Sequence, residues 1–180
     1  GMAGSIRVLH IDDEPDFANL TADFLERECD YFDVVTEIQA TNGLDRIRNE
    51  EFDCIVSDHD MPSMTGIELL KSVRDEYPDL PFILFTGKGS EEVASDAISA
   101  GVTDYLQKES GTDQYAILAN RIENAVDRQQ SEQAVQEQKR RLETIISNVP
   151  GLIYRCRNEP GWPMDEVAGE CEKLAGYSPE

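Results

Sequence analysis

The sequence predicts an α/β fold in which helices cover both faces of a doubly wound, five-stranded parallel sheet. Two observations predict this fold. Five short apolar segments of strand length alternate with segments of helical periodicity, and polar residues stand where most of the apolar segments end. Because the crossover between two parallel strands is right-handed, such an alternation places the helices outside the sheet.

The first half of the chain supplies three of these strands. Residues 6–11 form an apolar run that leads into an acidic pair, after which Pro15 suits the first turn of a helix. The apolar residues of this helix recur at helical spacing and are expected to cover one face of the sheet. They are Phe17, Leu20, Phe24 and Leu25. Residues 34–36 favour a second strand, a short helix around residues 44–47 follows, and residues 54–56 are typical of a buried third strand.

The second half continues the alternation. Residues 67–73 have helical periodicity, and residues 81–86 are an apolar run of strand length. Ser90 can cap a helix that has acidic residues in its first turn and that Gly101 stops. Residues 105–106 predict the fifth strand, which ends in Lys108.

A long helix is predicted from Asp113 onward, since neither Gly nor Pro occurs between that residue and Pro150. Its second half contains a short run in the a and d positions of a heptad repeat. The run consists of Val135, Gln138, Leu142, Ile145 and Val149. A homodimeric coiled coil and a solvated linker helix are both compatible with this pattern.

Composition limits the classes of function. The 37 acidic and 16 basic residues give a net charge of −21, which repels nucleic acid and anionic membrane surfaces. No run of about 18 apolar residues is present, and the start of the chain lacks a secretory signal, so a cytoplasmic protein without a membrane anchor is expected. The excess of acid suggests the hypothesis of a salt-loving source. The four cysteines are too scattered for a zinc ribbon.

The polar residues that end the predicted strands point to phosphoryl chemistry. In an open parallel sheet, ligands bind outside the carboxyl ends of the strands. Asp12, Asp13 and Asp58 would meet there, and crowded carboxylates with a phosphate select Mg²⁺. Asp58 is the natural nucleophile for forming an aspartyl phosphate, Lys108 would bind phosphoryl oxygens, and Thr86 would donate its hydroxyl to another oxygen.

These residues resemble the receiver domain of two-component response regulators. The resemblance rests on five elements in chain order: Asp12-Asp13, the D-x-x-M-P-x-x-x-G pattern from Asp58 to Gly66, Thr86, Tyr105 and Lys108. It implies a flavodoxin-like sheet of order 2-1-3-4-5 and a phosphoryl donor that is a histidine kinase or a phosphotransfer protein.

The resemblance also implies roles for single residues. Asp13, Asp58 and the backbone carbonyl of Asp60 would bind the metal, with Asp12 bound through water. Thr86 and Tyr105 would form a conformational switch, in which Tyr105 turns inward as Thr86 moves toward the phosphate. Such a module is not a conventional enzyme, because it supports only its own phosphorylation and dephosphorylation.

Two departures from the family pattern concern the surroundings of the site. Glu109 follows Lys108 where the family usually has proline, which leaves the conformation of the Lys108-Glu109 peptide open. Asp60 and Lys88 each stand two positions after a central residue, Asp58 and Thr86 respectively. We expect this pair to tune the lifetime of the phosphoryl group.

Two other classes of function remain compatible with parts of the pattern. The Asp58-x-Asp60 motif after a strand also resembles the nucleophile of haloacid-dehalogenase-type phosphatases, although in that family the acidic pair follows the Lys. A receiver-like interaction module that is never phosphorylated is the second alternative. Such a module would more naturally lack Asp58, Thr86 or Lys108.

The end of the chain resembles the start of a PAS sensor domain. The similarity begins near residue 142 and includes the Gly176-Tyr177-Ser178-Pro179 segment. The expected organisation is a tag or disordered segment at residues 1–5, a receiver domain at 6–128, a helical linker at 129–149 and a PAS fragment at 150–180. This order resembles the front of hybrid sensory proteins, in which a histidine kinase often lies further on.

Overall fold

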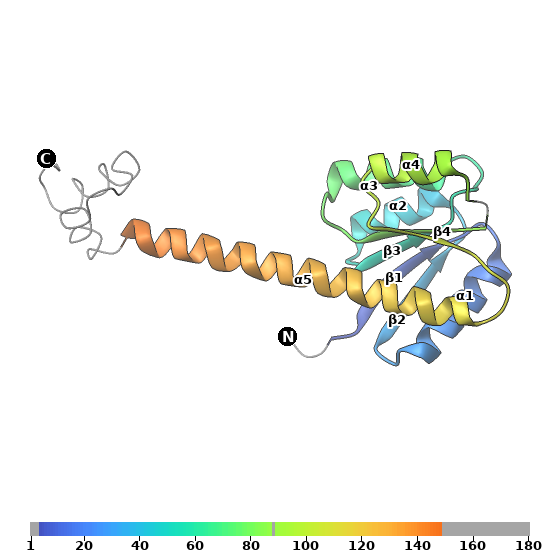
Figure 1. Ribbon diagram of the computed structural model, residues 1–180, viewed down its shortest axis with the longest axis horizontal. Helices are drawn as coiled ribbons and strands as arrows, with labels where there is room; N and C mark the ends of the chain where they lie inside the picture. The colour runs from blue at the N-terminus through green and yellow to red at the C-terminus, as the bar shows by residue number, and fades with distance from the viewer. Residues whose placement is uncertain (1–3, 88, 149–180) are drawn as a thin grey trace, which may run out of the picture. The chain divides into compact units, whose positions relative to one another are not determined.

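A computed structural model describes residues 4–87 and 89–148 of the chain. The chain divides into two compact units, Gly1–Gln130 and Ser131–Glu180. The first unit contains a sheet with helices on both faces (Figure 1). The expected PAS fragment at residues 150–180 lies outside the described residues, and so does Lys88.

The sheet has five parallel strands in the order β2-β1-β3-β4-β5, which confirms the predicted fold class and strand order. The strands are β1 (Ile6–Ile11), β2 (Phe32–Glu37), β3 (Cys54–Ser57), β4 (Phe82–Thr86) and β5 (Asp104–Gln107). In the register of β1 with β3, Ile11 lies opposite Ser57. The residues that follow these two strands, Asp12 and Asp58, are therefore neighbours at the carboxyl edge.

Two helices cover one face of the sheet and three cover the other (Figure 1). The helices are α1 (Pro15–Glu28), α2 (Ala40–Asn49), α3 (Gly66–Glu76), α4 (Glu91–Ser99) and α5 (Asp113–Asn148). One apolar cluster joins α1 and the first part of α5 to the sheet, and the other joins α2, α3 and α4 to the opposite face. Both clusters include fully buried residues of the central strands, such as Ile55 and Val56 on β3.

The buried face of α1 agrees with the apolar periodicity except at Leu20. Leu20 is 47% exposed, whereas Ala18, Thr21 and Leu25 are buried. Small residues at positions 18, 21 and 22 let the helix approach the sheet closely. Leu25 is fully buried and Phe17 packs against the same apolar cluster, so Leu20 is the only exposed residue of the predicted four.

The helix ends follow the capping signals of the sequence. Thr65 and Glu68 form a capping box at the start of α3, with bonds of 3.2 Å to the Glu68 amide and 3.0 Å to the Glu68 carboxylate. The Ser90 hydroxyl accepts a bond from the amide of Val93 at the start of α4. Gly101 follows α4 with a φ of +88°, a conformation that glycine adopts without steric cost.

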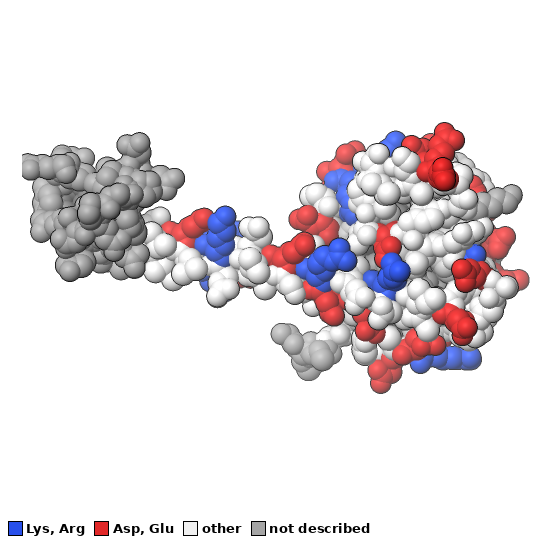
Figure 2. All heavy atoms as spheres, viewed as in Figure 1, with Lys and Arg blue, Asp and Glu red and all other residues white. Residues whose placement is uncertain are grey.

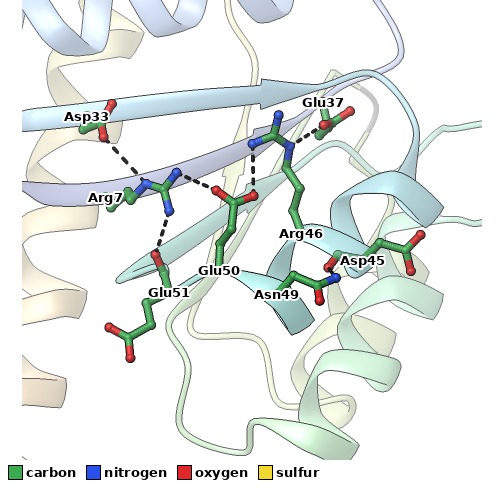
Figure 3. A network of polar contacts seen from close by, with 8 residues as sticks. All are labelled: Arg7, Asp33, Glu37, Asp45, Arg46, Asn49, Glu50 and Glu51. Atoms are coloured by element: carbon green, nitrogen blue, oxygen red, sulfur yellow. Dashed lines mark hydrogen bonds and ion pairs between the residues drawn. The ribbon is translucent and has the colours of Figure 1, made fainter.

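An ionic network joins β1, β2 and α2 on the side of the sheet shown in Figure 3. Glu50 lies between two guanidinium groups, 2.7 Å from Arg7 and 3.2 Å from Arg46. Arg46 also contacts Glu37 at 2.5 Å. These side chains remain partly exposed, so we expect each pair to contribute little to the stability of the fold.

The described residues of the second unit belong to the continuation of α5. Each of the residues 131–148 is exposed, including the apolar side chains of Val135, Leu142 and Ile145. Acidic side chains outnumber basic ones over the visible face of the first unit, whereas the helix shows both kinds (Figure 2). No helix in the described part of the chain is long and apolar enough to cross a membrane.

Candidate functional site

Three carboxylates gather at the carboxyl edge of the sheet. Asp12 and Asp13 follow β1, and Asp58 follows β3, where its amide donates a 2.9 Å bond to the carbonyl of Ile11. Asp12 is fully buried, Asp58 is 7% exposed and Asp13 is partly exposed. One oxygen from each carboxylate lies within 4.8 Å of the other two. The structure thus brings together the acidic residues that the sequence predicts.

Lys108 places its ammonium group beside two of these carboxylates. Its Nζ lies 2.6 Å from Oδ2 of Asp12 and 3.4 Å from Oδ2 of Asp58. Burial lowers the pKa of Lys108, but the hydrogen bond and negative charge of Asp12, followed by the charge of Asp58, outweigh this effect and raise the pKa above its ordinary value. Lys108 therefore carries its charge throughout the neutral range.

The acidic cluster still has an excess of negative charge. Desolvation and then the charge of Asp12 raise the pKa of Asp13. One ammonium group does not neutralise three carboxylates, and oxygen donors at this spacing suit a small, hard divalent cation such as Mg²⁺. The donor set of Asp12, Asp13 and Asp58 fits that ion.

The backbone around Asp58 orients its carboxylate. The amide of His59 donates a 2.8 Å bond to Oδ1 of Asp58, which leaves Oδ2 toward Lys108. Gly66 starts α3 directly against this loop, and a Cβ atom there would lie 2.2 Å from the carbonyl oxygen of Asp58. Only glycine permits such a close approach. The Gly of the D-x-x-M-P-x-x-x-G pattern therefore has a steric role.

Thr86 and Tyr105 each hold an unpaired hydroxyl in the described structure. Thr86 ends β4, is fully buried and has no hydrogen-bond partner for Oγ1 among the described residues. The hydroxyl of Tyr105 is likewise buried without a partner there, at a point where a Cβ on Gly89 would lie 2.6 Å away. Burial, and then the charge of Asp60, raise the pKa of Tyr105. An unpaired buried hydroxyl is costly, which favours a ligand or rearrangement that satisfies it.

The remaining predicted residues are placed less centrally. Asp60 is exposed on the loop after β3, and Lys88 lies outside the described residues. The peptide between Lys108 and Glu109 is trans, since no peptide bond in the described residues is cis. His10 is fully buried, and burial followed by the charge of Lys108 lowers its pKa to about 4.

Sequence reasoning missed one residue that contacts the site. The Nζ of Lys108 lies 4.3 Å from the ring centre of Phe17, close enough for a cation–π interaction. Phe17 in turn contacts Phe85 of β4 with a centroid distance of 6.0 Å. Phe17 lies in the first turn of α1, directly after the acidic pair, and this nearness in the sequence is the signal that could have placed it at this edge.

The fold and the edge cluster together define a class of protein: an open, doubly wound α/β domain with an acidic, lysine-containing pocket suited to phosphoryl transfer. A family model for the response regulator receiver domain matches residues 8–120, which is more than half of the 180 residues. The chain belongs to this family. It is a phosphorelay domain of two-component signalling and not a conventional enzyme, and the match to this family decides against the phosphatase alternative.

Solved structures and curated relatives agree with this assignment. The receiver domain protein (CheY-like) of Methanospirillum hungatei JF-1 is 29% identical, with a TM-score of 0.65 over 72% of this chain and 99% of that one. Hybrid signal transduction histidine kinase D of Dictyostelium discoideum is 29% identical over 73% of this chain, but the chain spans only 8% of its length. The bacterioopsin transcriptional activator of Halobacterium salinarum is 25% identical over 99% of this chain, which spans 27% of that relative.

Proposed function

We propose that Asp58 is the phosphoacceptor of this receiver domain. The main support for this proposal is that Oδ2 of Asp58 lies 3.4 Å from the ammonium of Lys108 within a cluster of three carboxylates. Oδ2 attacks the phosphorus of a phosphohistidine, the P–N bond breaks, and the electron pair leaves with the imidazole. Such transfer needs mainly positioning and charge neutralisation, which this edge of the sheet offers.

The site residues divide the remaining tasks. Asp12, Asp13, Asp58 and the backbone carbonyl of Asp60 would hold Mg²⁺, which would supply positive charge to the phosphoryl oxygens when bound. Lys108 binds one of these oxygens as a compact point charge. The unpaired hydroxyl of Thr86 donates a hydrogen bond to another, which would satisfy a buried polar group that has no partner among the described residues.

Phosphorylation at Asp58 would be read out through Thr86 and Tyr105. Movement of the Thr86 hydroxyl toward the phosphate changes the space beside Tyr105, whose own hydroxyl is unpaired within the described structure. Tyr105 then alters the surface made by α4, β5 and α5. The exposed side chains Ile98 and Ile117, 72% and 48% exposed, belong to that surface.

Asp60 and Lys88 are proposed to tune the lifetime of the phosphoryl group. This proposal rests on their positions in the sequence, and the exposure of Asp60 at the rim of the site is compatible with it. Replacing Lys88 with Ala should change the rate of dephosphorylation. A rate equal to that of the wild type would show that Lys88 does not tune the lifetime of the phosphoryl group.

The phosphoryl donor is proposed to be a histidine kinase or a phosphotransfer protein, as expected of a receiver domain. The larger organisation proposed is a receiver domain at residues 6–128, a helical linker at 129–149 and the beginning of a PAS domain at 150–180. The match to the Halobacterium salinarum activator over 99% of this chain supports a continuation of the relationship past the receiver domain.

The helical linker is proposed to pair with a second copy of the chain. Two features support this: Val135, Leu142 and Ile145 are 63%, 54% and 56% exposed, and residues 131–148 contain three acidic and three basic residues in a chain of net charge −21. A neutral segment lets two acidic copies approach. Sedimentation should show a dimer that Leu142→Glu disrupts, and a wild-type monomer at 100 µM would contradict pairing.

Intact-mass measurement tests the phosphoacceptor assignment. Acetyl phosphate with Mg²⁺ should add one phosphoryl group to the wild type, and the adduct should be absent without Mg²⁺ or in Asp58→Asn. Continuous turnover of acetyl phosphate without a lasting adduct would favour a phosphatase. A wild type without any adduct would favour a silent interaction module.

A further inference from the structure

The amide group of Gln114 joins the loop that follows Lys108 to the start of α5. Its Oε1 accepts a 2.9 Å hydrogen bond from the backbone N–H of Glu109, and its Nε2 donates a 2.8 Å bond to the carbonyl of Gly111. Gln114 is only 8% exposed although it is polar. Both ends of its buried amide are thus satisfied by the backbone of one loop.

This loop has few other means of staying in place. Residues 109–113 are exposed, and Gly111 has open space around the position of a Cβ atom and a φ of +95°. A loop without packed side chains depends on its hydrogen bonds for a defined conformation. The two hydrogen bonds of Gln114, which form a clasp, hold this loop at Glu109, the residue directly after Lys108, and at Gly111.

The backbone of Lys108 is consequently fixed from two sides. Its own N–H donates a 2.8 Å bond to the carbonyl of Thr86 on β4, and the next N–H, that of Glu109, is held by Gln114 on α5. The flexible side chain of Lys108 must then place its ammonium between Asp12 and Asp58. If the backbone at Lys108 changed its orientation, the ammonium group at the end of the side chain would move away from the two carboxylates.

We propose that Gln114 is a positioning residue for phosphoryl transfer, acting by holding the Lys108-Glu109 peptide so that the Lys108 ammonium stays between the carboxylates. Gln114 contacts neither the metal site nor the phosphoacceptor. This inference rests on the proposed function of Asp58 and Lys108.

The test compares Gln114→Ala with Gln133→Ala, the same change at an exposed position of the same helix. The rate of phosphoryl uptake from acetyl phosphate at saturating Mg²⁺ should fall about fivefold in Gln114→Ala, which corresponds to about 1 kcal/mol or one net hydrogen bond. Gln133→Ala should keep the wild-type rate. Urea unfolding of both variants shows how much of each protein is folded during the assay.

A second readout separates positioning from general damage. The Lys108 ammonium repels a divalent cation in the same pocket, so loosening it should raise Mg²⁺ affinity by about twofold while the uptake rate falls. Calorimetric titration with Mg²⁺ alone measures this affinity. A site that is merely damaged would lose affinity and rate together, and that result would overturn the proposal.

Glu109→Pro provides the double-mutant cycle, because proline lacks the N–H that Gln114 accepts. Gln114→Ala should have a smaller effect on the uptake rate in the Glu109→Pro background, where only its bond to the carbonyl of Gly111 remains to be lost. An equal fivefold loss in both backgrounds, or a wild-type rate in Gln114→Ala, would contradict the proposal. Failure of the wild type itself to take up a phosphoryl group would instead contradict the assignment of Asp58.

Discussion

The ammonium of Lys108 lies 2.6 Å from the fully buried carboxylate of Asp12, closer than its 3.4 Å distance to Asp58. This ion pair compensates a charge that would otherwise be buried alone, and it leaves Oδ2 of Asp58 as the less tightly held oxygen. The ammonium group of Lys108 thus stabilises the pocket when no metal is bound, and it is placed where it can bind a phosphoryl group. Stability and function of the site are linked through one residue.

Lys108→Ala should therefore destabilise the metal-free protein. Removing one partner of a buried pair leaves Asp12 uncompensated, and we expect the free energy of unfolding to fall by about 3 kcal/mol in urea with a chelator. Added Mg²⁺ should recover part of this loss, because the ion replaces the missing positive charge. Lys139→Ala, at an exposed position of α5, should change stability by less than about 0.5 kcal/mol. Equal effects of the two variants would contradict the role of the pair.

Asp13→Asn should stabilise the metal-free protein while weakening Mg²⁺ binding. The pKa of Asp13 is raised above its ordinary 3.8 in the folded state, so folding favours its protonated form and Asp13 lowers stability as the pH rises above that value. Asparagine removes this penalty, and we expect the variant to be more stable than the wild type at pH 7 in the presence of a chelator.

The pH dependence of that gain identifies its origin. It should vanish as the pH falls below 3.8, where Asp13 is protonated in both the folded and unfolded states. Urea unfolding of the wild type and the variant at several pH values measures the difference. If the variant were less stable than the wild type at pH 7 without metal, repulsion between Asp13 and the neighbouring carboxylates would not be the main effect of Asp13 on stability.

Gly66→Ala should damage both the fold and the site, because the new Cβ would lie 2.2 Å from the backbone oxygen of Asp58. The loop must shift to relieve this contact, and we expect a loss of about 1–3 kcal/mol together with slower phosphoryl uptake. Gly87→Ala is the matched control, since its Cβ would meet only the Lys108 side chain at 3.8 Å. A Gly66→Ala protein as stable as Gly87→Ala would contradict the steric argument.

Salt should stabilise this protein. A net charge of −21 repels itself in dilute buffer, and the screening length falls from about 10 Å at 0.1 M to about 3 Å at 1 M ionic strength. We expect Tm to rise by at least about 4 °C over this range, which corresponds to about 1 kcal/mol. Thermal unfolding across a NaCl series measures it. Greater stability at low salt than at high salt would count against the hypothesis of a salt-loving source.

The sequence was sufficient for the sheet and for the acidic cluster, for a topological reason. In a parallel sheet the residues after each strand reach the same edge, so Asp12, Asp58 and Thr86 could be brought together from their strand positions alone. The alternation of apolar segments similarly predicts the strand number. Neither inference depends on the conformation of a side chain.

Features that depend on side-chain packing could not be predicted in the same way. Leu20 is exposed although it shares the apolar periodicity of Leu25, which is fully buried, and the sequence pattern does not distinguish the two. The contact of Lys108 with Phe17 depends on how the end of β5 lies against α1, and the bond from the Glu109 amide to Gln114 depends on the path of an exposed loop that no apolar pattern marks. These contacts required the three-dimensional arrangement of β5, α1 and α5.

Locating the phosphoryl group on the chain tests most directly whether Asp58 is the phosphoacceptor. Borohydride reduces an aspartyl phosphate to homoserine and releases phosphate, which marks the modified residue permanently for peptide mass spectrometry. After treatment with acetyl phosphate and Mg²⁺, we expect homoserine at position 58 in the wild type and no homoserine in Asp58→Asn. Homoserine at position 12, 13 or 60 in the wild type would contradict it.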